Sequence, residues 1–329
     1  MVGSHSLKHR YVRVNGIRYH FVEAGVGPLV LMIHGFPELW YSFRRQLAAL
    51  AAAGYHAVAV DLRGFGESEG TPRVEDYALL GHAEDVKALV ASLGAREATF
   101  VGHDWGANLV WAMALRYPEL VNGVVALSIP FYPEPPDPAE IKRFARGSFN
   151  FVEYFSRPRA VESEFEQEPQ RFFRALFYGL SGDAPPGTID HLYRGKPATA
   201  KLLDGFPLPN ALPPWLSEQD LEYYVAAFTK TGLSGPLGFY RNLERDYPAL
   251  KEIYRGTLRQ PVLFIGGAEE AAVRFGSLEP MRRALPQLKK ALTLPGCGHW
   301  VQQERSEVVN REMIEFLKQS IERGAASAT

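Results

Sequence analysis

The residues of this chain best suited to chemistry lie in the pattern Gly-His-Asp-Trp-Gly at residues 102–106. An apolar run at residues 98–101 precedes the pattern, and a run with helical spacing at residues 108–116 follows it. Glycines two residues before and two after a nucleophile allow a sharp turn from strand to helix. Asp104 occupies the nucleophile position, where the dipole at the helix N-terminus favours an anion. We therefore predict that Asp104 is a nucleophile; an aspartate that only caps the helix is the alternative.

A carboxylate nucleophile restricts the class of electrophile. When a carboxylate attacks saturated carbon it forms an ester, whose carbonyl group water can then attack. A serine in the same reaction would leave a stable ether. Asp104 therefore favours strained epoxides or carbon–halogen bonds, and it disfavours ordinary ester or amide cleavage. The predicted chemistry is a displacement followed by hydrolysis of the covalent intermediate.

The hydrolysis step needs a base and an oxyanion hole. His299, in Gly-Cys-Gly-His-Trp at residues 296–300, follows a strand-like run and is the predicted base. Two backbone N–H groups are expected to form the hole. One belongs to Trp105, directly after the nucleophile, and the other to Phe36 in the His-Gly-Phe-Pro loop at residues 34–37. His34 itself is expected to make structural hydrogen bonds.

An acidic residue is expected to orient the histidine. In folds with this type of turn, the chain order is nucleophile, acid, histidine. The acid should follow the strand-like run at residues 262–265, where Glu269 and Glu270 are the candidates. A carboxylate there would fix the tautomer of His299 and stabilise its charged form.

Strand-like and helical runs alternate before residue 130 and again after residue 260. This alternation predicts an α/β fold with a mostly parallel central sheet and helices on both faces. The predicted strands are residues 11–14, 17–23, 29–33, 57–60, 98–101, 121–129, 261–267 and 290–294, and the predicted helices are residues 43–53, 76–93, 108–116 and 306–323.

The middle of the chain differs in character. Four prolines lie within residues 133–138, and residues 139–244 are rich in aromatic side chains and contain no clean strand pattern. We predict a first part of the core at residues 7–132, a helical lid at residues 133–245 and a second part of the core at residues 246–323. An apolar substrate pocket is expected between the lid and the core.

Composition narrows the function class further. The 329 residues are 46% hydrophobic and carry a formal net charge of -1, which does not favour a nucleic-acid partner. No apolar stretch approaches the roughly 20 residues of a membrane helix, and residues 1–6 lack a signal-peptide pattern. Cys297 is the single cysteine, and no metal or dinucleotide motif occurs. We expect a soluble cytoplasmic monomer or homodimer without cofactor or metal.

Five stretches of the sequence, from residue 34 to residue 300, resemble the soluble type of epoxide hydrolase. They are residues 34–42, 61–68, 102–106, 235–242 and 296–300. The resemblance implies an α/β-hydrolase fold with an inserted helical lid, and conversion of a small apolar epoxide to a vicinal diol. Dehalogenases share the Asp104 and His299 pattern, so a haloalkane or haloacid dehalogenase is an alternative, and a non-catalytic ligand-binding relative is another.

The resemblance also implies two lid tyrosines that hydrogen-bond to the epoxide oxygen. Tyr240 matches the second by its surrounding motif. The first should precede Phe155 by four residues, but that position holds Phe151, which cannot donate. Tyr154 is the predicted replacement; the alternatives are a single tyrosine or help from His191. The expected substrate pocket includes Phe151, Trp300 and His103.

The family acid is aspartate, and by its spacing from Pro261 it falls on Glu270. Glutamate preserves the charge but reaches about 1.5 Å further, the length of one added carbon–carbon bond. We take Glu270 first and Glu269 second. Some relatives carry the acid after the strand that ends here at Ile129, where Glu134 and Asp137 fit poorly because of the prolines between them.

Overall fold

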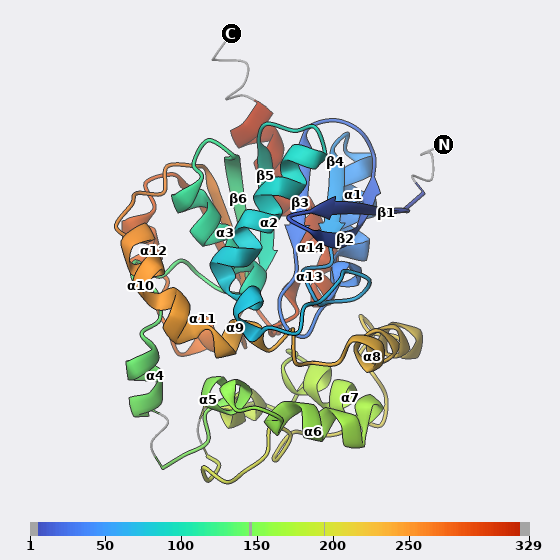
Figure 1. Cartoon of the computed structure of the whole chain (residues 1–329), viewed down its shortest axis with the longest axis vertical. Coiled ribbons are helices and arrows are strands. Elements are labelled where there is room, and N and C mark those ends of the chain that lie inside the picture. Colours follow the sequence, from blue (N-terminus) through green and yellow to red (C-terminus); the bar gives the residue numbers. More distant parts are fainter. Residues whose placement is uncertain (1–5, 145–146, 194, 323–329) are drawn as a thin grey trace.

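A computed structural model describes residues 6–144, 147–193 and 195–322 (Figure 1). The expectation that residues 1–6 contain no signal peptide therefore concerns residues that lie, except for residue 6, outside the described ranges. One eight-stranded sheet forms the core, in the order β1-β2-β4-β3-β5-β6-β7-β8. Strand β2 runs antiparallel to both of its neighbours, and the remaining pairs are parallel. The strands are β1 Lys8–Val14, β2 Ile17–Ala24, β3 Leu29–Ile33, β4 His56–Val60, β5 Ala98–His103, β6 Val121–Leu127, β7 Val262–Gly267 and β8 Leu288–Leu294.

Helices cover both faces of the sheet because its inner strands are apolar on both sides. Along β3, Leu31 and Ile33 belong to one hydrophobic cluster, whereas Val30 and Met32 belong to another. The first cluster packs against α2 (Leu79–Ser92) and α3 (Trp105–Arg116). The second packs against α1 (Arg44–Ala52) and α14 (Ser306–Phe316). The remaining core helices are η1 Trp40–Phe43, η2 Val74–Tyr77, α11 Ala271–Arg274, α12 Glu279–Ala284, α13 Val301–Glu304 and η4 Leu317–Glu322.

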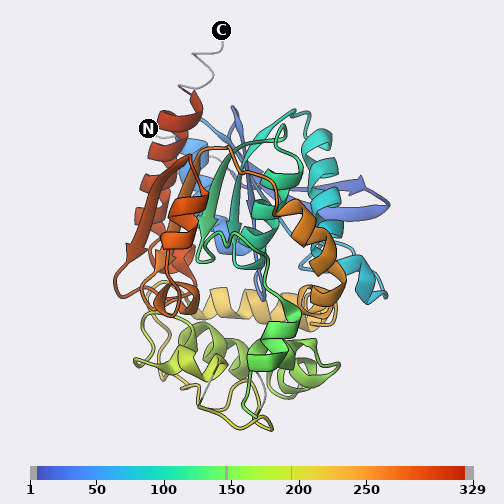
Figure 2. The same ribbon diagram turned by 90° about the vertical axis from the view of Figure 1, so that its left-hand side faces the viewer.

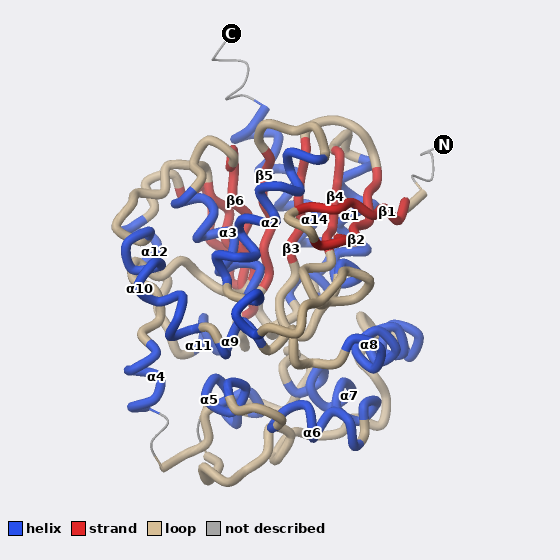
Figure 3. The backbone as a smooth tube through the Cα atoms, in the orientation of Figure 1, coloured by secondary structure: helices blue, strands red, loops and turns tan. Residues whose placement is uncertain are grey.

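The helical insertion lies across one end of the sheet (Figure 2). Figure 3 shows helices and loops in this layer and strands only in the core. Within the described part of residues 139–244, the only β contact is an isolated bridge between Ser148 and Pro197. The insertion contains α4 Pro138–Phe144, α5 Phe151–Ser156, α6 Ala160–Gln167, α7 Pro169–Gly179, η3 Thr188–Leu192 and α8 Glu218–Thr231.

Helices α9 (Gly238–Arg241) and α10 (Leu243–Ile253) return the chain to the core. The Asp246 carboxylate in α10 accepts a hydrogen bond of 2.7 Å from the backbone N–H of Leu79. No helix in the described ranges is both long enough and apolar enough to cross a membrane.

Several predicted boundaries shift in the structure. Strand β6 ends at Leu127 and not at residue 129, because Ser128 adopts a positive φ of 68° that turns the chain. Helix α3 starts at Trp105, three residues earlier than predicted, directly after the nucleophile position. The predicted helix at residues 76–93 is divided into η2 and α2, because Ala78 between them is not helical.

The turn between β5 and α3 leaves no room for side chains at its two glycines. Asp104 has φ 54° and ψ −120°, a conformation that most residues avoid. A Cβ atom on Gly102 would lie 2.2 Å from the carbonyl oxygen of Gly106. A Cβ atom on Gly106 would lie 2.1 Å from the carbonyl oxygen of Ile33 in β3. The two glycines therefore let the turn pack directly against the sheet.

Replacement of Gly106 by alanine should destabilise the protein, because the obstacle is backbone of the central strand. We expect Gly106→Ala to lower the free energy of unfolding by about 2–3 kcal/mol, as overpacking does. Gly81→Ala in α2 is the matched control. Its Cβ would have 3.4 Å to the nearest atom, so stability should stay level or rise by about 0.5 kcal/mol. Urea unfolding measures both, and equal midpoints would contradict the role assigned to Gly106.

Candidate active site

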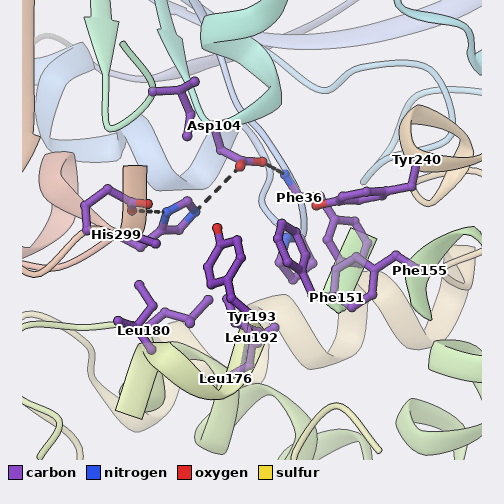
Figure 4. A pocket seen from close by; sticks show the side chains of 15 residues that line it. Phe36, Asp104, Phe151, Phe155, Leu176, Leu180, Leu192, Tyr193, Tyr240 and His299 are labelled. Carbon is purple, nitrogen blue, oxygen red and sulfur yellow. Dashed lines mark hydrogen bonds and ion pairs between the residues drawn. The ribbon is translucent and has the colours of Figure 1, made fainter. Parts of the chain in front are cut away.

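Three side chains from separate loops form a chain of contacts at the carboxyl end of the sheet (Figure 4). The Nε2 atom of His299 lies 3.8 Å from Oδ2 of Asp104, and its Nδ1 atom lies 2.6 Å from Oε2 of Glu270. Glu270 is the N-cap of α11 and accepts a 3.2 Å hydrogen bond from the backbone N–H of Ala272. This cap fixes the carboxylate while leaving its other oxygen for the imidazole. The arrangement is that of nucleophile, base and orienting acid.

Backbone N–H groups stabilise the Asp104 carboxylate. The N–H of Phe36 donates to Oδ1 of Asp104 over 2.9 Å, and the N–H of Trp105 lowers the pKa of the same carboxylate. Gly35 allows the approach, because a Cβ atom there would lie 2.3 Å from the same oxygen. Oδ2 is therefore the oxygen that faces His299, while Oδ1 already occupies the position of an ester carbonyl oxygen.

The Asp104 side chain opens onto two adjoining cavities. The inner cavity, about 550 Å³ including solvent-open space, is enclosed mainly by the insertion. The outer cavity, about 1930 Å³ on the same measure, opens toward α4 and α11. Both are lined by Asp104, Ile129, Phe151, Tyr193, Tyr240 and Ala271. A substrate at Asp104 can therefore extend in two directions.

Comparison with known proteins agrees with this geometry. Residues 28–306 match the alpha/beta hydrolase fold family. The curated "Epoxide hydrolase A" of Mycobacterium tuberculosis is 37% identical over 314 residues, which cover 94% of this chain and 96% of that protein. This chain belongs to the epoxide hydrolase family of the α/β-hydrolase fold.

Solved structures place it in the same family. An epoxide hydrolase from an endophytic Streptomyces is 40% identical, with a TM-score of 0.90 and 95% of each chain covered. Epoxide hydrolase A from Mycobacterium thermoresistibile is 38% identical, with a TM-score of 0.89, over 95% of this chain and 99% of that one. The family assignment thus rests on nearly the full chain, including the helical insertion.

Two of the residues expected from the family resemblance line both cavities. Tyr240, in α9, and Phe151, the first residue of α5, lie side by side with ring centroids 6.1 Å apart. The Tyr240 ring also packs edge-on against Trp105 at 5.1 Å, and the Trp105 ring is stacked on Phe239 at 5.1 Å. Tyr240 is therefore fixed at the edge of the nucleophile turn.

The expectation that Tyr154 replaces the missing lid tyrosine is wrong. Its hydroxyl donates to the Glu164 carboxylate, its ring packs on Phe149, and it lines neither cavity. Phe151 and Phe155, four residues apart, share the face toward the inner cavity. Tyr154 lies three residues after Phe151, so its side chain is rotated by roughly 60° about the helix axis relative to that of Phe151. This rotation turns Tyr154 away from the inner cavity. His191 also lines neither cavity.

His103 and Trp300 likewise do not line the substrate pocket. Both are fully buried behind the triad. His103 donates through Nε2 to the carbonyl oxygen of His299 over 2.7 Å, and Trp300 donates through Nε1 to the carbonyl oxygen of Phe177 over 2.8 Å. His103 and Trp300 are neighbours in sequence of Asp104 and His299. Their side chains still point elsewhere, because successive side chains in a tight loop point in different directions. These two side chains hold the His299 loop from behind.

The structure also distinguishes the acid candidates. Glu269 is paired with Arg274 at 3.4 Å on the loop surface, whereas Glu270 is buried against His299. Asp137 caps α4 through the N–H of Ala139 and does not reach the histidine. His34 makes the expected structural hydrogen bonds, with Nδ1 to the Gly35 carbonyl and Nε2 from the Leu62 N–H.

Sequence reasoning missed Glu38 and Tyr193. Glu38 is fully buried, contacts Nδ1 of His103 and accepts from the side-chain amides of Gln302 and Gln303. Glu38 lies in residues 34–42, one of the stretches that resemble epoxide hydrolases, so that stretch could have pointed to it. Tyr193 lines both cavities but lies outside every motif, so no local pattern pointed to it.

Burial and charge act against each other across the triad. Burial raises the pKa of Asp104, and His299, His103 and the N–H groups of Phe36 and Trp105 partly offset this. Burial opposes the charge on His299, but the Glu270 carboxylate, followed by those of Asp104 and Glu38, raises its pKa to about 9. The free site therefore favours an imidazolium beside an ionised Asp104 at neutral pH.

Outside the cleft, three possible metal ligands lie together: His9 of β1, His20 of β2 and Glu67 of the loop that follows β4. Their ligand atoms lie within 4.8 Å of one another. In the structure, Nδ1 of His9 and Nε2 of His20 hydrogen-bond to each other at 2.9 Å, and Tyr11 donates to Glu67. These atoms thus satisfy one another without an ion.

Replacement of Glu270 by glutamine should move the acid limb of the pH–rate profile to lower pH. The ester hydrolysis step needs neutral imidazole, and the negative charge of Glu270 raises the pKa of His299, so its loss lowers that pKa. We expect kcat at pH 8 to fall by about 10²–10⁴-fold, because the amide stabilises the imidazolium less well. Steady-state diol formation from pH 5 to 10 measures both effects.

Glu269→Gln is the matched control, since this neighbouring carboxylate is exposed and does not touch His299. Its kcat should stay within about twofold of the parent value, in keeping with a surface substitution. Loss of activity in Glu269→Gln with Glu270→Gln unaffected would reverse the assignment of the acid.

Proposed function

We propose that this protein hydrolyses apolar epoxides to vicinal diols through a covalent ester on Asp104. One observation carries the proposal: Oδ1 of Asp104 accepts from the Phe36 N–H, Oδ2 lies 3.8 Å from His299, and the residue lines both cavities. A carboxylate so placed can attack saturated carbon, and the ester so formed lies ready for attack by water. The names of the family relatives agree with this activity.

In the first step, Oδ2 of Asp104 forms a bond to a ring carbon as that carbon's bond to the epoxide oxygen breaks. The ring oxygen takes the electron pair and becomes an alkoxide. Tyr240, at the junction of the two cavities, is the proposed hydrogen-bond donor to this oxygen. The high pKa of Tyr240, raised by burial and by the charge of Asp104, keeps its hydroxyl protonated for this task.

In the second step, His299 removes a proton from water and the hydroxide attacks the ester carbonyl. Formation of the ester cancels the charge of Asp104, which contributes to the raised pKa of His299. The imidazolium therefore releases its proton more readily after the first step, and the neutral imidazole that remains can accept a proton from water. The N–H groups of Phe36 and Trp105 stabilise the oxyanion, with removal of such a donor typically costing about 10²–10³-fold in rate.

The cavities indicate the class of epoxide. Leu176, Leu180, Ile189 and Leu192 give the inner cavity an apolar wall. Arg274 is the one lysine or arginine lining either cavity in the part of the chain that the structure describes, and it pairs with Glu269 and Asp190. We propose that the substrate is an uncharged epoxide with one apolar substituent in the inner cavity and room for a larger one in the outer cavity. Residues 133–245 then act as the lid.

A dehalogenase is less compatible with these residues. A leaving halide needs N–H donors close to the nucleophile. Trp105 has an indole N–H, but the neighbouring Phe36 ring, packed on Phe155 and Tyr240, offers no second donor. Halide release from chloro- and bromoalkanes, together with inactivity on epoxides, would favour that second function.

His299→Gln should trap the covalent intermediate. Ring opening at Asp104 does not need the imidazole as a base, whereas ester hydrolysis does. Incubation of this variant with styrene oxide should therefore add one substrate mass to the intact protein, on the peptide that contains Asp104. Diol formation should fall by at least about 10²-fold, the usual contribution of a general base. Intact and peptide mass spectrometry, with diol analysis by chromatography, provide the measurements.

Two variants control this experiment. Asp104→Asn should give neither adduct nor diol during the assay. His56→Gln replaces a histidine that lies on β4 and pairs with Glu23, far from the cleft in the chain's topology, and it should turn over like the parent. Absence of adduct and of turnover across small, aryl and fatty epoxides would favour a non-catalytic binding protein.

A further inference from the structure

The cleft has a second tyrosine hydroxyl that the sequence motifs do not identify. Phe151 fills the position where a lid tyrosine was expected, and its ring contacts three neighbours edge-on. The centroids of Phe155, Tyr193 and Tyr240 lie 5.6, 5.1 and 6.1 Å from its own. Phe151 thus packs between the two tyrosines, and Tyr193 adjoins the place where a donor is missing.

Tyr193 follows η3 in the insertion and reaches the cleft from the side opposite to α9. Figure 4 shows its hydroxyl pointing up toward Asp104 and His299, while the Tyr240 hydroxyl points toward Asp104 from the other side. Phe151 and Phe275 pack edge-on against the Tyr193 ring at 5.1 and 6.1 Å. The residue is 37% exposed, so its ring is held at the wall of the open cleft with its hydroxyl inside.

The Tyr193 hydroxyl is suited to donate. Burial raises its pKa, and the charges of Glu270 and Asp104 with the nearby Tyr132 raise it further, so the hydroxyl stays protonated. In contrast, the Tyr154 hydroxyl is already engaged by Glu164. Tyr193 lines the inner cavity together with Asp104 and His299, so its hydroxyl can meet a substrate bound at the carboxylate.

We propose that Tyr193 is a catalytic residue that, together with Tyr240, hydrogen-bonds to the epoxide oxygen and protonates it during ring opening. This inference rests on the proposed epoxide hydrolysis and assigns the donor that Phe151 cannot supply. The lid would thus keep two hydroxyls at the cleft but take one from the η3 loop, and not from α5.

Protons balance over the two steps. As Oδ2 of Asp104 bonds to carbon, the departing ring oxygen receives a proton from one of the two tyrosines, which leaves a tyrosinate. The His299 imidazolium then passes its proton to the tyrosinate through water and becomes the neutral base. In the second step water gives one proton to His299 and its hydroxide to the ester carbon, and the released alcohol oxygen takes the proton of the resulting Asp104 carboxylic acid. The sum is epoxide plus water to diol, with His299 protonated again as in the free site.

The test isolates ring opening in the His299→Gln background, where adduct formation on Asp104 reports the first step alone. With styrene oxide, adding Tyr193→Phe should slow adduct formation by about 10–100-fold, since two donors share the usual 10²–10⁴-fold effect of a general acid. Adding Tyr240→Phe as well should slow it further. Phe151→Tyr added to Tyr193→Phe should recover at least about fivefold, because a hydroxyl at position 151 enters the same part of the cleft.

Tyr178→Phe is the control, since this half-buried lid tyrosine lines neither cavity, and it should leave the adduct rate unchanged. Thermal unfolding checks that Tyr193→Phe remains folded. An adduct rate equal to the parent's in Tyr193→Phe would overturn the proposal, as would a loss seen only in KM or a loss that follows Tyr154→Phe instead. If the His299→Gln protein forms no adduct and the unmodified protein no diol, the proposed function fails first.

Discussion

The structure depends on keeping one carboxylate charged inside an apolar cleft. Burial disfavours the ionised form of Asp104, and this is offset by the rings of His299 and His103 and by the N–H groups of Phe36 and Trp105. These groups lie at the carboxyl ends of β3, β5 and β8. An unpaired buried charge is very unfavourable, so these groups must be correctly placed before the nucleophile can exist as an anion. Gly102 and Gly106 also help to place the nucleophile, because they allow its turn to pack directly against backbone atoms of the sheet.

The same charge also orders the two proposed chemical steps. While Asp104 is ionised, it helps Glu270 and Glu38 to raise the pKa of His299, so the ring is already protonated in the free site and cannot accept a further proton. Esterification removes that charge and leaves Glu270 to orient a more neutral imidazole. His299 therefore becomes a neutral base at the stage when the ester on Asp104 has formed. No movement of the chain is required, because the change lies in the electrostatic field.

Support for this centre extends well behind it. The His299 carbonyl accepts from Ser128 over 2.6 Å and from His103 over 2.7 Å, and its backbone N–H donates to the Leu180 carbonyl of the insertion over 2.8 Å. Glu38 in turn contacts His103. The base is therefore held from the core on one side and from the insertion on the other. Such second layers of hydrogen bonds keep catalytic groups within a narrow range of orientations.

The sequence alone determined the strand–helix order, the turn at Asp104 and the loops that carry His299 and Phe36, because these depend on local spacing that fixes backbone geometry. Only the tertiary structure decided the side-chain neighbours. It placed Glu270 and not Glu269 at the imidazole, turned Tyr154 to Glu164, buried His103 and Trp300, and brought Tyr193 to the cleft. These outcomes depend on helix rotation and on loops that meet from distant parts of the chain, which no short sequence pattern encodes.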